Sequence, residues 1–180
     1  MEGADRGFAK EVSQRSGVIT DLCWHCKCCS GGCPFAHAMD FLPNQVIRMV
    51  QLGIREQVLS CGAIWLCVGC NTCSMECPTA IDMAAVMDAL RQMAIEQGEA
   101  IAEPDILNFH REVINSIYRH GRTHKLEIML RYKLQTRKWL SDMNTGLRMM
   151  SKRKLDLRPS KVTHIAAIRR MFRQNPGGRP

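Results

Sequence analysis

Apolar residues recur along this chain at the three- and four-residue spacing of helices, and no stretch alternates as a half-buried strand does. The first such segment covers about 44–52; Pro43 opens it, as proline does at a first helical turn, and Gly53 ends it. A second short helix is expected over about 55–60. The face predicted to be buried consists of Val46, Ile47, Val50 and Ile54. The pattern therefore predicts an all-α protein.

The longest apolar stripe follows Pro78. Residues 79–82 read Thr-Ala-Ile-Asp and resemble a capping box with Asp in the place of Glu, so a long helix is predicted from there to about 97. Gly98 supplies the stop. Methionines at this spacing are predicted to fill the core rather than to bind a metal. The stripe consists of Ile81, Ala84, Ala85, Leu90 and Ala94, filled out by Met83, Met87 and Met93.

The second half also has a helical pattern. Pro104 opens a helix over about 104–120, and Gly121 closes it. Its predicted buried face consists of Ile106, Phe109, Val113 and Ile117. Further helices are predicted over 125–134, over 136–150 and from Pro159 to about 173.

Composition divides the chain into three parts. Residues 1–20 are polar, with several glycines, and are predicted to form a flexible N-terminal arm. Residues 21–100 hold all ten cysteines and should form one compact domain, and residues 101–175 should form a basic helical extension. The last residues, Asn-Pro-Gly-Gly-Arg-Pro, are expected to be disordered.

One cysteine pattern occurs twice. Residues 23–34 read CWHCKCCSGGCP and residues 67–78 read CVGCNTCSMECP. Each is Cys-x2-Cys-x2-Cys-x3-Cys-Pro, the run that binds [4Fe–4S] clusters in two-cluster bacterial ferredoxins. The sequence therefore predicts two [4Fe–4S] clusters as cofactors.

In such proteins the fourth cysteine of each run ligates the other cluster. The ligands predicted for cluster 1 are Cys23, Cys26, Cys29 and Cys77. Those predicted for cluster 2 are Cys67, Cys70, Cys73 and Cys33. This crossing would join the two halves of the domain into one core.

Two other uses of these cysteines are less favoured. A disulfide framework is typical of small secreted chains, whereas the N-terminus has no apolar signal segment. Structural zinc usually takes two Cys-x2–4-Cys pairs, and runs of four cysteines with a terminal proline do not match that spacing. Zinc is therefore the second choice.

Several residues near the runs have open roles. Cys28 and Cys61 fall outside the ligand spacing and are expected to be small buried apolar side chains. Trp65 precedes a ligand by two residues, so its ring either shields a cluster from water or packs in the core. The six histidines form no paired metal spacing. His25 lies inside the first run and could hydrogen-bond a cluster sulfur, although a solvent-facing position is expected for all six.

The charge is asymmetric. Residues 1–100 contain 7 Lys/Arg and 11 Asp/Glu, whereas residues 101–180 contain 18 and 6. A basic half can bind nucleic acid, but docking on an acidic partner protein is the favoured interpretation. No apolar run has the length needed to cross a bilayer, so we expect a soluble protein without direct membrane insertion. No phosphate loop, dinucleotide fingerprint or nucleophile arrangement is present, so no catalytic residue is predicted.

Two such runs joined by helices resemble the α-helical ferredoxin domain, which succinate dehydrogenase iron–sulfur subunits share. A closer resemblance is to the C subunit of heterodisulfide reductase. It rests on both cysteine runs, the Ile64-Trp65-Leu66-Cys67 sequence before the second run, and residues 78–82 after it. The basic C-terminal half, with Gly121-Arg122 and Leu157-Arg158-Pro159, is also similar.

This resemblance implies an electron-transfer protein that has no catalytic site of its own. Such a protein takes electrons from a flavin- and cluster-bearing A subunit and delivers them to a catalytic B subunit. The B subunit reduces the mixed disulfide of coenzyme M and coenzyme B, or a related acceptor, in the cytoplasm of an anaerobe. Two alternatives stay open: an iron–sulfur subunit of a quinone-linked membrane oxidoreductase, and a zinc-dependent nucleic-acid-binding module.

Overall fold

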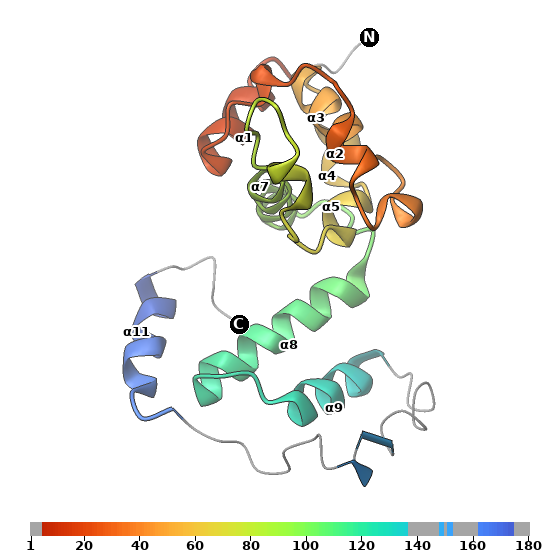
Figure 1. Cartoon of the computed structure of the whole chain (residues 1–180). Coiled ribbons are helices and arrows are strands. Elements are labelled where there is room, and N and C mark those ends of the chain that lie inside the picture. Colours follow the sequence, from red (N-terminus) through yellow and green to blue (C-terminus); the bar gives the residue numbers. More distant parts are fainter. Residues whose placement is uncertain (1–4, 137–147, 150, 153–161, 175–180) are drawn as a thin grey trace. The chain divides into compact units, whose positions relative to one another are not determined.

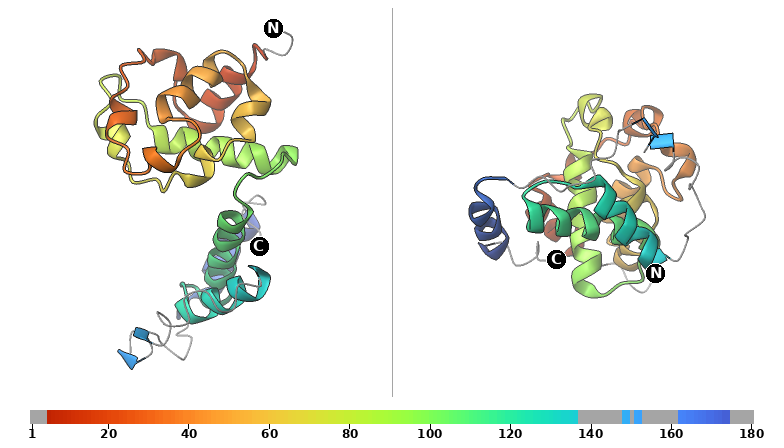
Figure 2. Two further views of the ribbon diagram at one scale, coloured as in Figure 1. Left: turned by 90° about the vertical axis from the view of Figure 1, so that its right-hand side faces the viewer. Right: turned by 90° about the horizontal axis from the view of Figure 1, so that it is seen from below.

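The structure is a computed structural model that describes residues 5–136, 148–149, 151–152 and 162–174. It divides into two compact units, one ending at Glu103 and the other beginning at Pro104 (Figure 1). In these residues every regular element is a helix, and no strand occurs. The all-α prediction is therefore confirmed for the described chain. Further views of the helices of each unit are given in Figure 2.

The first unit begins with a helix, not with a loose arm. Helix α1 spans Phe8–Ser16, and both Phe8 and Val12 are fully buried where it packs on helices α3 and α7. Arg55 holds this helix through ion pairs with Asp5 and Glu11 and lies over the Phe8 ring. The predicted flexible arm over residues 1–20 is therefore wrong from Phe8 onward, because two apolar residues one turn apart suffice to anchor a polar helix.

Two longer helices form the centre of the first unit. Helix α3 spans Pro43–Gln51 and helix α7 spans Met83–Gln97, close to the predicted ranges. The Asp82 carboxylate accepts hydrogen bonds from the N–H groups of Ala84 and Ala85. Asp82 is thus the N-cap itself, and the predicted capping box starting at Thr79 is wrong. Gly98 ends α7 in the left-handed conformation, as predicted.

Short elements connect these helices and carry the cysteine runs. Their bounds are Thr20–Leu22 (η1), Cys28–Gly31 (α2), Ala36–Ala38 (η2), Arg55–Leu59 (α4), Ala63–Leu66 (α5) and Thr72–Met75 (α6). The Asp40 carboxylate caps α5 by accepting bonds of 2.7 Å from the N–H groups of Gly62 and Ala63. Arg91 of α7 donates to the carbonyl oxygens of Ile64 and Cys67. The start of the second run is therefore fixed from two sides.

The core of the first unit is aliphatic and rich in methionine. Met83, Met87 and Met93 are buried, which confirms their predicted role as core residues. Cys61 is buried at 4% exposure, as expected, and Trp65 is buried at 2% exposure. Trp65 does not line either of the cysteine cavities described below. Of its two predicted roles, the structure therefore supports core packing.

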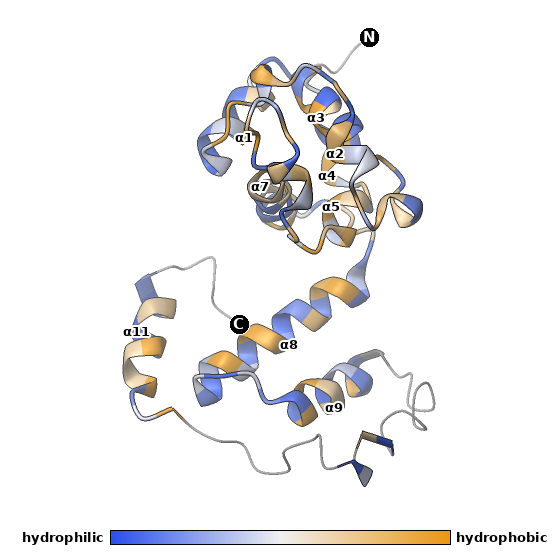
Figure 3. Cartoon of the chain, viewed as in Figure 1, coloured by the Kyte–Doolittle hydropathy of each residue, from blue (hydrophilic) through white to orange (hydrophobic). Residues whose placement is uncertain are grey.

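The second unit consists of helices α8 (Pro104–His120), α9 (Lys125–Thr136) and α11 (Ile165–Gln174), with α8 packed on the other two. Among its described residues, only Leu107 and Ile128 are buried apolar side chains. The predicted face of α8 is not a buried core: Ile106, Val113 and Ile117 are partly buried, and Phe109 is exposed. Figure 3 shows apolar and polar residues interspersed along α8.

Polar contacts join α8 and α9, in addition to the edge-to-face packing of Phe109 on Tyr132. The Glu127 carboxylate accepts hydrogen bonds from Arg119 (2.9 Å) and His120 (2.6 Å) of α8, and from Arg131 of α9 (3.0 Å). Burial would raise the pKa of Glu127, but the bonds from His120, Arg119 and Arg131 outweigh it and lower this pKa. The lowered pKa favours the ionised form of Glu127, which is the common acceptor of these three side chains.

Other C-terminal predictions have mixed outcomes. Helix α11 begins at Ile165, later than the predicted start at Pro159, which lies outside the described residues together with the tail after residue 174. Most of the helix predicted over 136–150 also lies outside them. In the part of the chain that the structure describes, no helix has the length and apolar character needed to cross a membrane.

Candidate metal centre

The two cysteine runs fold alike, residue by residue. In the first run, His25 and Lys27 have positive φ angles of 57° and 68°, and helix α2 begins at the next residue. In the second run, the equivalent Gly69 and Asn71 have φ angles of 62° and 60°, and helix α6 begins at the next residue. Left-handed non-glycine residues cost roughly 1–3 kcal/mol each and concentrate at functional sites. The repeated strain thus indicates that this loop shape serves the cysteines.

A serine ties each loop to the helix that follows it. Ser30 donates to the Asn44 side chain (2.6 Å) and accepts from the Asn44 N–H (3.1 Å) at the start of α3. Ser74 donates to the Asp82 carboxylate (3.1 Å) and accepts from the Met83 N–H (3.2 Å) at the start of α7. Each serine directly follows the third cysteine of its run, so both runs are anchored at the same point.

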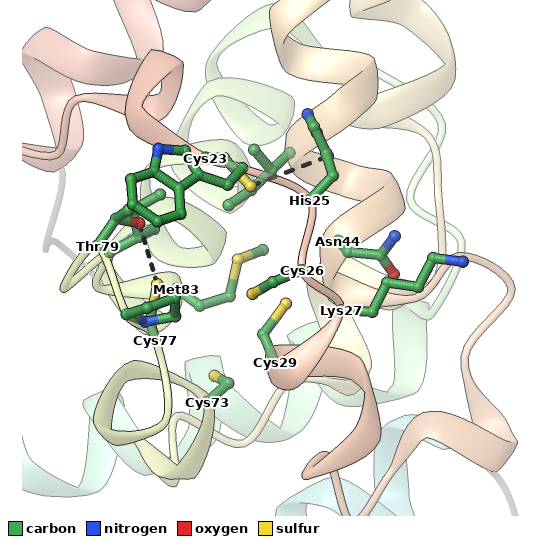
Figure 4. A pocket seen from close by; sticks show the side chains of 14 residues that line it. Cys23, His25, Cys26, Lys27, Cys29, Asn44, Cys73, Cys77, Thr79 and Met83 are labelled. Atoms are coloured by element: carbon green, nitrogen blue, oxygen red, sulfur yellow. Dashed lines mark hydrogen bonds between the residues drawn. The ribbon is translucent and has the colours of Figure 1, made fainter.

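The first cavity lies between the two loops and has a volume of about 410 Å³, part of which is open to solvent. Figure 4 shows the thiols of Cys26, Cys29 and Cys77 directed toward one space, with Met83 beside them. Its cysteines are Cys23, Cys26, Cys29, Cys73 and Cys77. The cavity therefore gathers the first three cysteines of the first run and the last cysteine of the second.

The second cavity is the counterpart of the first. Its cysteines are Cys33, Cys67, Cys70 and Cys73. Three cysteines again come from one run, and Cys33 comes from the other. Cys73 and Met83 line both cavities, so the two spaces share a wall.

The inner thiols resist ionisation because they are buried among other thiols. Burial, and then the neighbouring Cys67, Cys29 and Cys70, raise the pKa of Cys73 to about 11. Burial is also the main cause that raises the pKa of Cys29. A cationic group in these cavities would offset this cost, since thiolates are the form that binds metal.

Outer thiols receive hydrogen bonds. The Thr79 hydroxyl lies 3.3 Å from Cys77 Sγ. Burial would raise the pKa of Cys77, but the Thr79 hydroxyl and nearby backbone N–H groups outweigh it and lower this pKa. The Thr72 hydroxyl lies 3.5 Å from Cys70 Sγ and, with the Thr72 N–H, lowers the pKa of Cys70. These two sulfurs are therefore predisposed to be thiolates.

His25 is partly buried, so the expected solvent-facing position is wrong for this histidine. Its Nε2 lies 2.8 Å from Gln51 Oε1, and its Nδ1 lies 3.9 Å from Cys23 Sγ. Gln51 in turn donates to the Thr20 carbonyl oxygen (2.9 Å). This chain of contacts explains how a histidine is held with a positive φ beside a cysteine.

Cys28 is exposed, so its predicted burial is wrong. It occupies the position of Thr72 in the other run, and a hydrogen bond with Cys26 is the main cause that raises its pKa. Sequence analysis also missed Trp24 and Thr79, which line the first cavity. Trp24 lies directly between two cysteines of a run and Thr79 directly follows a Cys-Pro, and this adjacency is the signal that could have identified them.

The donor set of each cavity fits a [4Fe–4S] cluster. All ten cysteines are free thiols, and the cysteines of the runs surround two spaces. In the described chain, no three His, Cys, Asp or Glu side chains converge closely enough to hold a single metal ion. Thiols spaced around a cavity suit a cluster that carries its own sulfide better than a single zinc ion, which needs its sulfurs at about 2.3 Å.

Comparison with known proteins agrees with this chemistry. Residues 19–81 match the 4Fe-4S dicluster domain family, so this part of the chain is a 4Fe–4S dicluster domain. The chain is 27% identical over 94 residues to the C subunit of the H(2):CoB-CoM heterodisulfide,ferredoxin reductase of Methanothermobacter thermautotrophicus, covering 52% of this chain and 51% of that protein. It is 31% identical over 130 residues to an iron-sulfur C subunit, numbered 2, of the CoB--CoM heterodisulfide reductase of Methanocaldococcus jannaschii, covering 67% and 66%.

The matched region is about half or less of two of these relatives. The match to the C subunit of the ferredoxin:CoB-CoM heterodisulfide reductase of Methanosarcina acetivorans is 36% identical but covers 49% of this chain and 36% of that protein. The chain spans about half the length of the first Methanothermobacter relative as well. Within these bounds, the chain is similar to the C subunit of heterodisulfide reductase, and residues 19–81 match the 4Fe-4S dicluster domain.

Proposed function

We propose that this chain is the iron–sulfur electron-transfer subunit of a heterodisulfide-reductase-like complex and that it holds two [4Fe–4S] clusters. The observation that carries this proposal is the pair of cavities, each lined by the first three cysteines of one run and the fourth of the other, with Cys73 in the lining of both. When bound, each cluster supplies a site that gains and loses one electron without a change in its bonds. The relatives' names supply the type of complex.

The cavity linings support two crossed ligand sets. Cys23, Cys26 and Cys29 would hold cluster 1 together with Cys77. Cys67, Cys70 and Cys73 would hold cluster 2 together with Cys33. Cys73 also lines the first cavity because it stands in the shared wall, and we keep it in the second set because its neighbours Cys67 and Cys70 line only the second cavity.

Residues around the thiols exclude water and keep the two sites close. Met83, Ile47 and Ile81 are buried and line the first cavity, and Met87 is buried and lines the second. The shared wall of Cys73 and Met83 places one site beside the other. Close neighbouring sites suit electron transfer, which needs no substrate pocket on this chain.

Partner subunits would approach the mouths of the cavities. Trp24 lines the first cavity and is 75% exposed, and Val68 lines the second and is 60% exposed. Exposed apolar side chains at these positions can exclude water between two redox centres. We propose that a flavin- and cluster-bearing A subunit and a catalytic B subunit are the partners, in the cytoplasm, and that the B subunit reduces the CoM-S-S-CoB heterodisulfide or a related acceptor.

The basic second half would assist this docking without inserting into a membrane or binding nucleic acid. Residues 101–180 contain 18 Lys/Arg and 6 Asp/Glu, and a surface of this charge attracts acidic partner surfaces. Raised salt should therefore weaken the complex.

The proposal is tested by anaerobic purification followed by iron, sulfide and zinc analysis. About eight irons and about eight acid-labile sulfides per chain are expected, together with co-purification of the partner subunits. Stoichiometric zinc, or iron near half that amount, would contradict it. Reduction of a disulfide by the isolated, cluster-loaded chain would contradict the non-catalytic role.

A further inference from the structure

The two cavities differ at the residue that follows each Cys-Pro pair. Thr79 follows Cys77 and Pro78, and Cys77 lines the first cavity. Phe35 follows Cys33 and Pro34, and Cys33 lines the second cavity. Thr79 offers a hydroxyl group, whereas Phe35 offers only a ring that is partly exposed to solvent. The same backbone position thus presents a hydrogen-bond donor to one site and none to the other.

The Thr79 hydroxyl is placed to donate to sulfur. Its oxygen lies 3.3 Å from Cys77 Sγ, and a dashed line marks this contact in Figure 4. The turn that aims it is held by the bond from the Ala80 N–H to the Cys77 carbonyl oxygen (3.1 Å). Ala80 has a positive φ of 53°, which is unusual for alanine. A strained backbone therefore fixes the hydroxyl beside this sulfur.

The other hydroxyls near the cysteines do not cancel this difference. Ser30 lies 3.9 Å from Cys29 Sγ, but its proton is directed to the Asn44 side chain. Thr72 lies 3.5 Å from Cys70 Sγ in the second cavity, and the Cys28 thiol contacts Cys26 at the matching place in the first. Thr72 and Cys28 thus contact a cysteine sulfur at matching positions of the two runs. Two contacts of the first cavity have no such counterpart, the Thr79 hydroxyl at 3.3 Å from Cys77 Sγ and, at a longer distance of 3.9 Å, His25 Nδ1 beside Cys23 Sγ.

One charged side chain that lines a cavity differs in the same direction, whereas Arg91 of α7 donates to the carbonyl oxygen of Cys67, beside the second cavity. Lys27 lines the first cavity where the equivalent Asn71 lines the second. The Lys27 ammonium group points away from the thiols in Figure 4, so its charge acts at longer range than the Thr79 hydroxyl. Positive charge and hydrogen bonds to ligand sulfur both favour the more negative, reduced state of a cluster.

We propose that the cluster site of the first cavity has the more positive reduction potential of the two, and that the Thr79 hydroxyl is a principal cause of the difference. This inference rests on the proposed function, because it needs clusters in both cavities. A protein carrying one electron would then hold it in the first cavity, with no bond made or broken.

The test compares two matched substitutions, Thr79→Val and Thr72→Val, in anaerobically purified, cluster-loaded full-length protein. Each removes one hydroxyl and keeps the side-chain shape, one beside Cys77 and the other beside Cys70. Thr79→Ser keeps the hydroxyl and serves as the rescue variant. The two midpoint potentials are measured by redox titration followed by EPR, after iron and sulfide analysis of each variant.

Two resolved midpoints are expected. Thr79→Val should lower the higher midpoint so that the ratio of reduced to oxidised cluster at a fixed potential falls about tenfold, ~59 mV for one electron. Thr72→Val should lower only the other midpoint, and Thr79→Ser should resemble the unchanged protein.

Three results would overturn the inference: indistinguishable midpoints, a Thr79→Val effect on the lower midpoint, or no effect of Thr79→Val. Failure of the proposed function is a separate outcome, since iron analysis of the unchanged protein would then show fewer than two clusters.

Discussion

Lys27 in the first cysteine loop and Asn71 in the second adopt the same left-handed conformation, each just before a four-residue helix. In each loop the serine after the third cysteine bonds to the N-terminus of the next long helix. Outside these shared features the loops diverge, with Cys28 opposite Thr72 and Phe35 opposite Thr79. The comparison teaches that ligand geometry is repeated, whereas the groups that contact the sulfurs are particular to each site.

Crossed ligation is the shared feature whose loss should have the largest effect. Cys77→Ser should disturb the same EPR signal as Cys23→Ser, because both side chains line the first cavity. Each substitution should lower iron from about eight to about four per chain if that cluster is lost. Iron analysis and EPR of the anaerobic proteins check this. Should Cys77→Ser instead share the signal lost in Cys67→Ser, each run would wrap its own cluster.

The next largest effect concerns the reactivity of cysteine thiols, which should differ between the two loops because only the first has a cysteine, Cys28, outside the ligand spacing. In the cluster-loaded protein, iodoacetamide should label Cys28 alone, about one site per chain, because it is the exposed cysteine outside the predicted ligand sets. The raised pKa of Cys28 should make this labelling slow at neutral pH and faster as the pH rises. Cys28 is exposed, whereas Cys61 is buried. Mass spectrometry identifies the labelled site, and Cys28→Thr, which copies the second loop, is the control that should abolish labelling. Faster labelling of any predicted ligand than of Cys28 would contradict the ligand sets.

The serine anchors should differ in strength. Ser30 is buried and Ser74 is only partly buried. Water can therefore replace a lost hydrogen bond less easily at Ser30, and the substitution Ser30→Ala should destabilise the protein more. Ser30→Ala should lower the free energy of unfolding by about 2 kcal/mol, and Ser74→Ala by about 1 kcal/mol. Anaerobic denaturant titration, read by loss of cluster absorbance, measures both. Equal losses would show that burial does not distinguish the anchors.

The smallest expected effect concerns backbone strain. Lys27 and Asn71 have φ angles of 68° and 60°, and asparagine tolerates this region better than lysine. Lys27→Gly should therefore stabilise the protein by roughly 1 kcal/mol, and Asn71→Gly by only a few tenths. The same denaturant titration compares them. A larger gain at Asn71 would mean that another contact holds Lys27 in place.

Local patterns in the sequence determined much of the first unit. Pro43 marks the start of α3, because its ring fixes φ at a value that suits the first helical turn. Gly98 marks the end of α7, because glycine readily adopts the left-handed conformation that ends a helix. The cysteine spacing predicted a dicluster iron–sulfur protein, since ligands of one loop are neighbours in sequence. The crossed ligand sets stay a prediction that the cavity linings support.

Only the tertiary structure decided which side chains became buried and which sulfurs met a hydroxyl. Phe8 and Val12 anchor α1 because α3 and α7 offer them a surface, although their own segment is polar. Phe109 is 39% exposed although its ring packs on Tyr132 of α9, because this contact covers only part of the ring. Thr79 reaches Cys77 through a turn at Ala80. Burial and such contacts depend on what packs opposite a residue, which spacing along the chain does not encode.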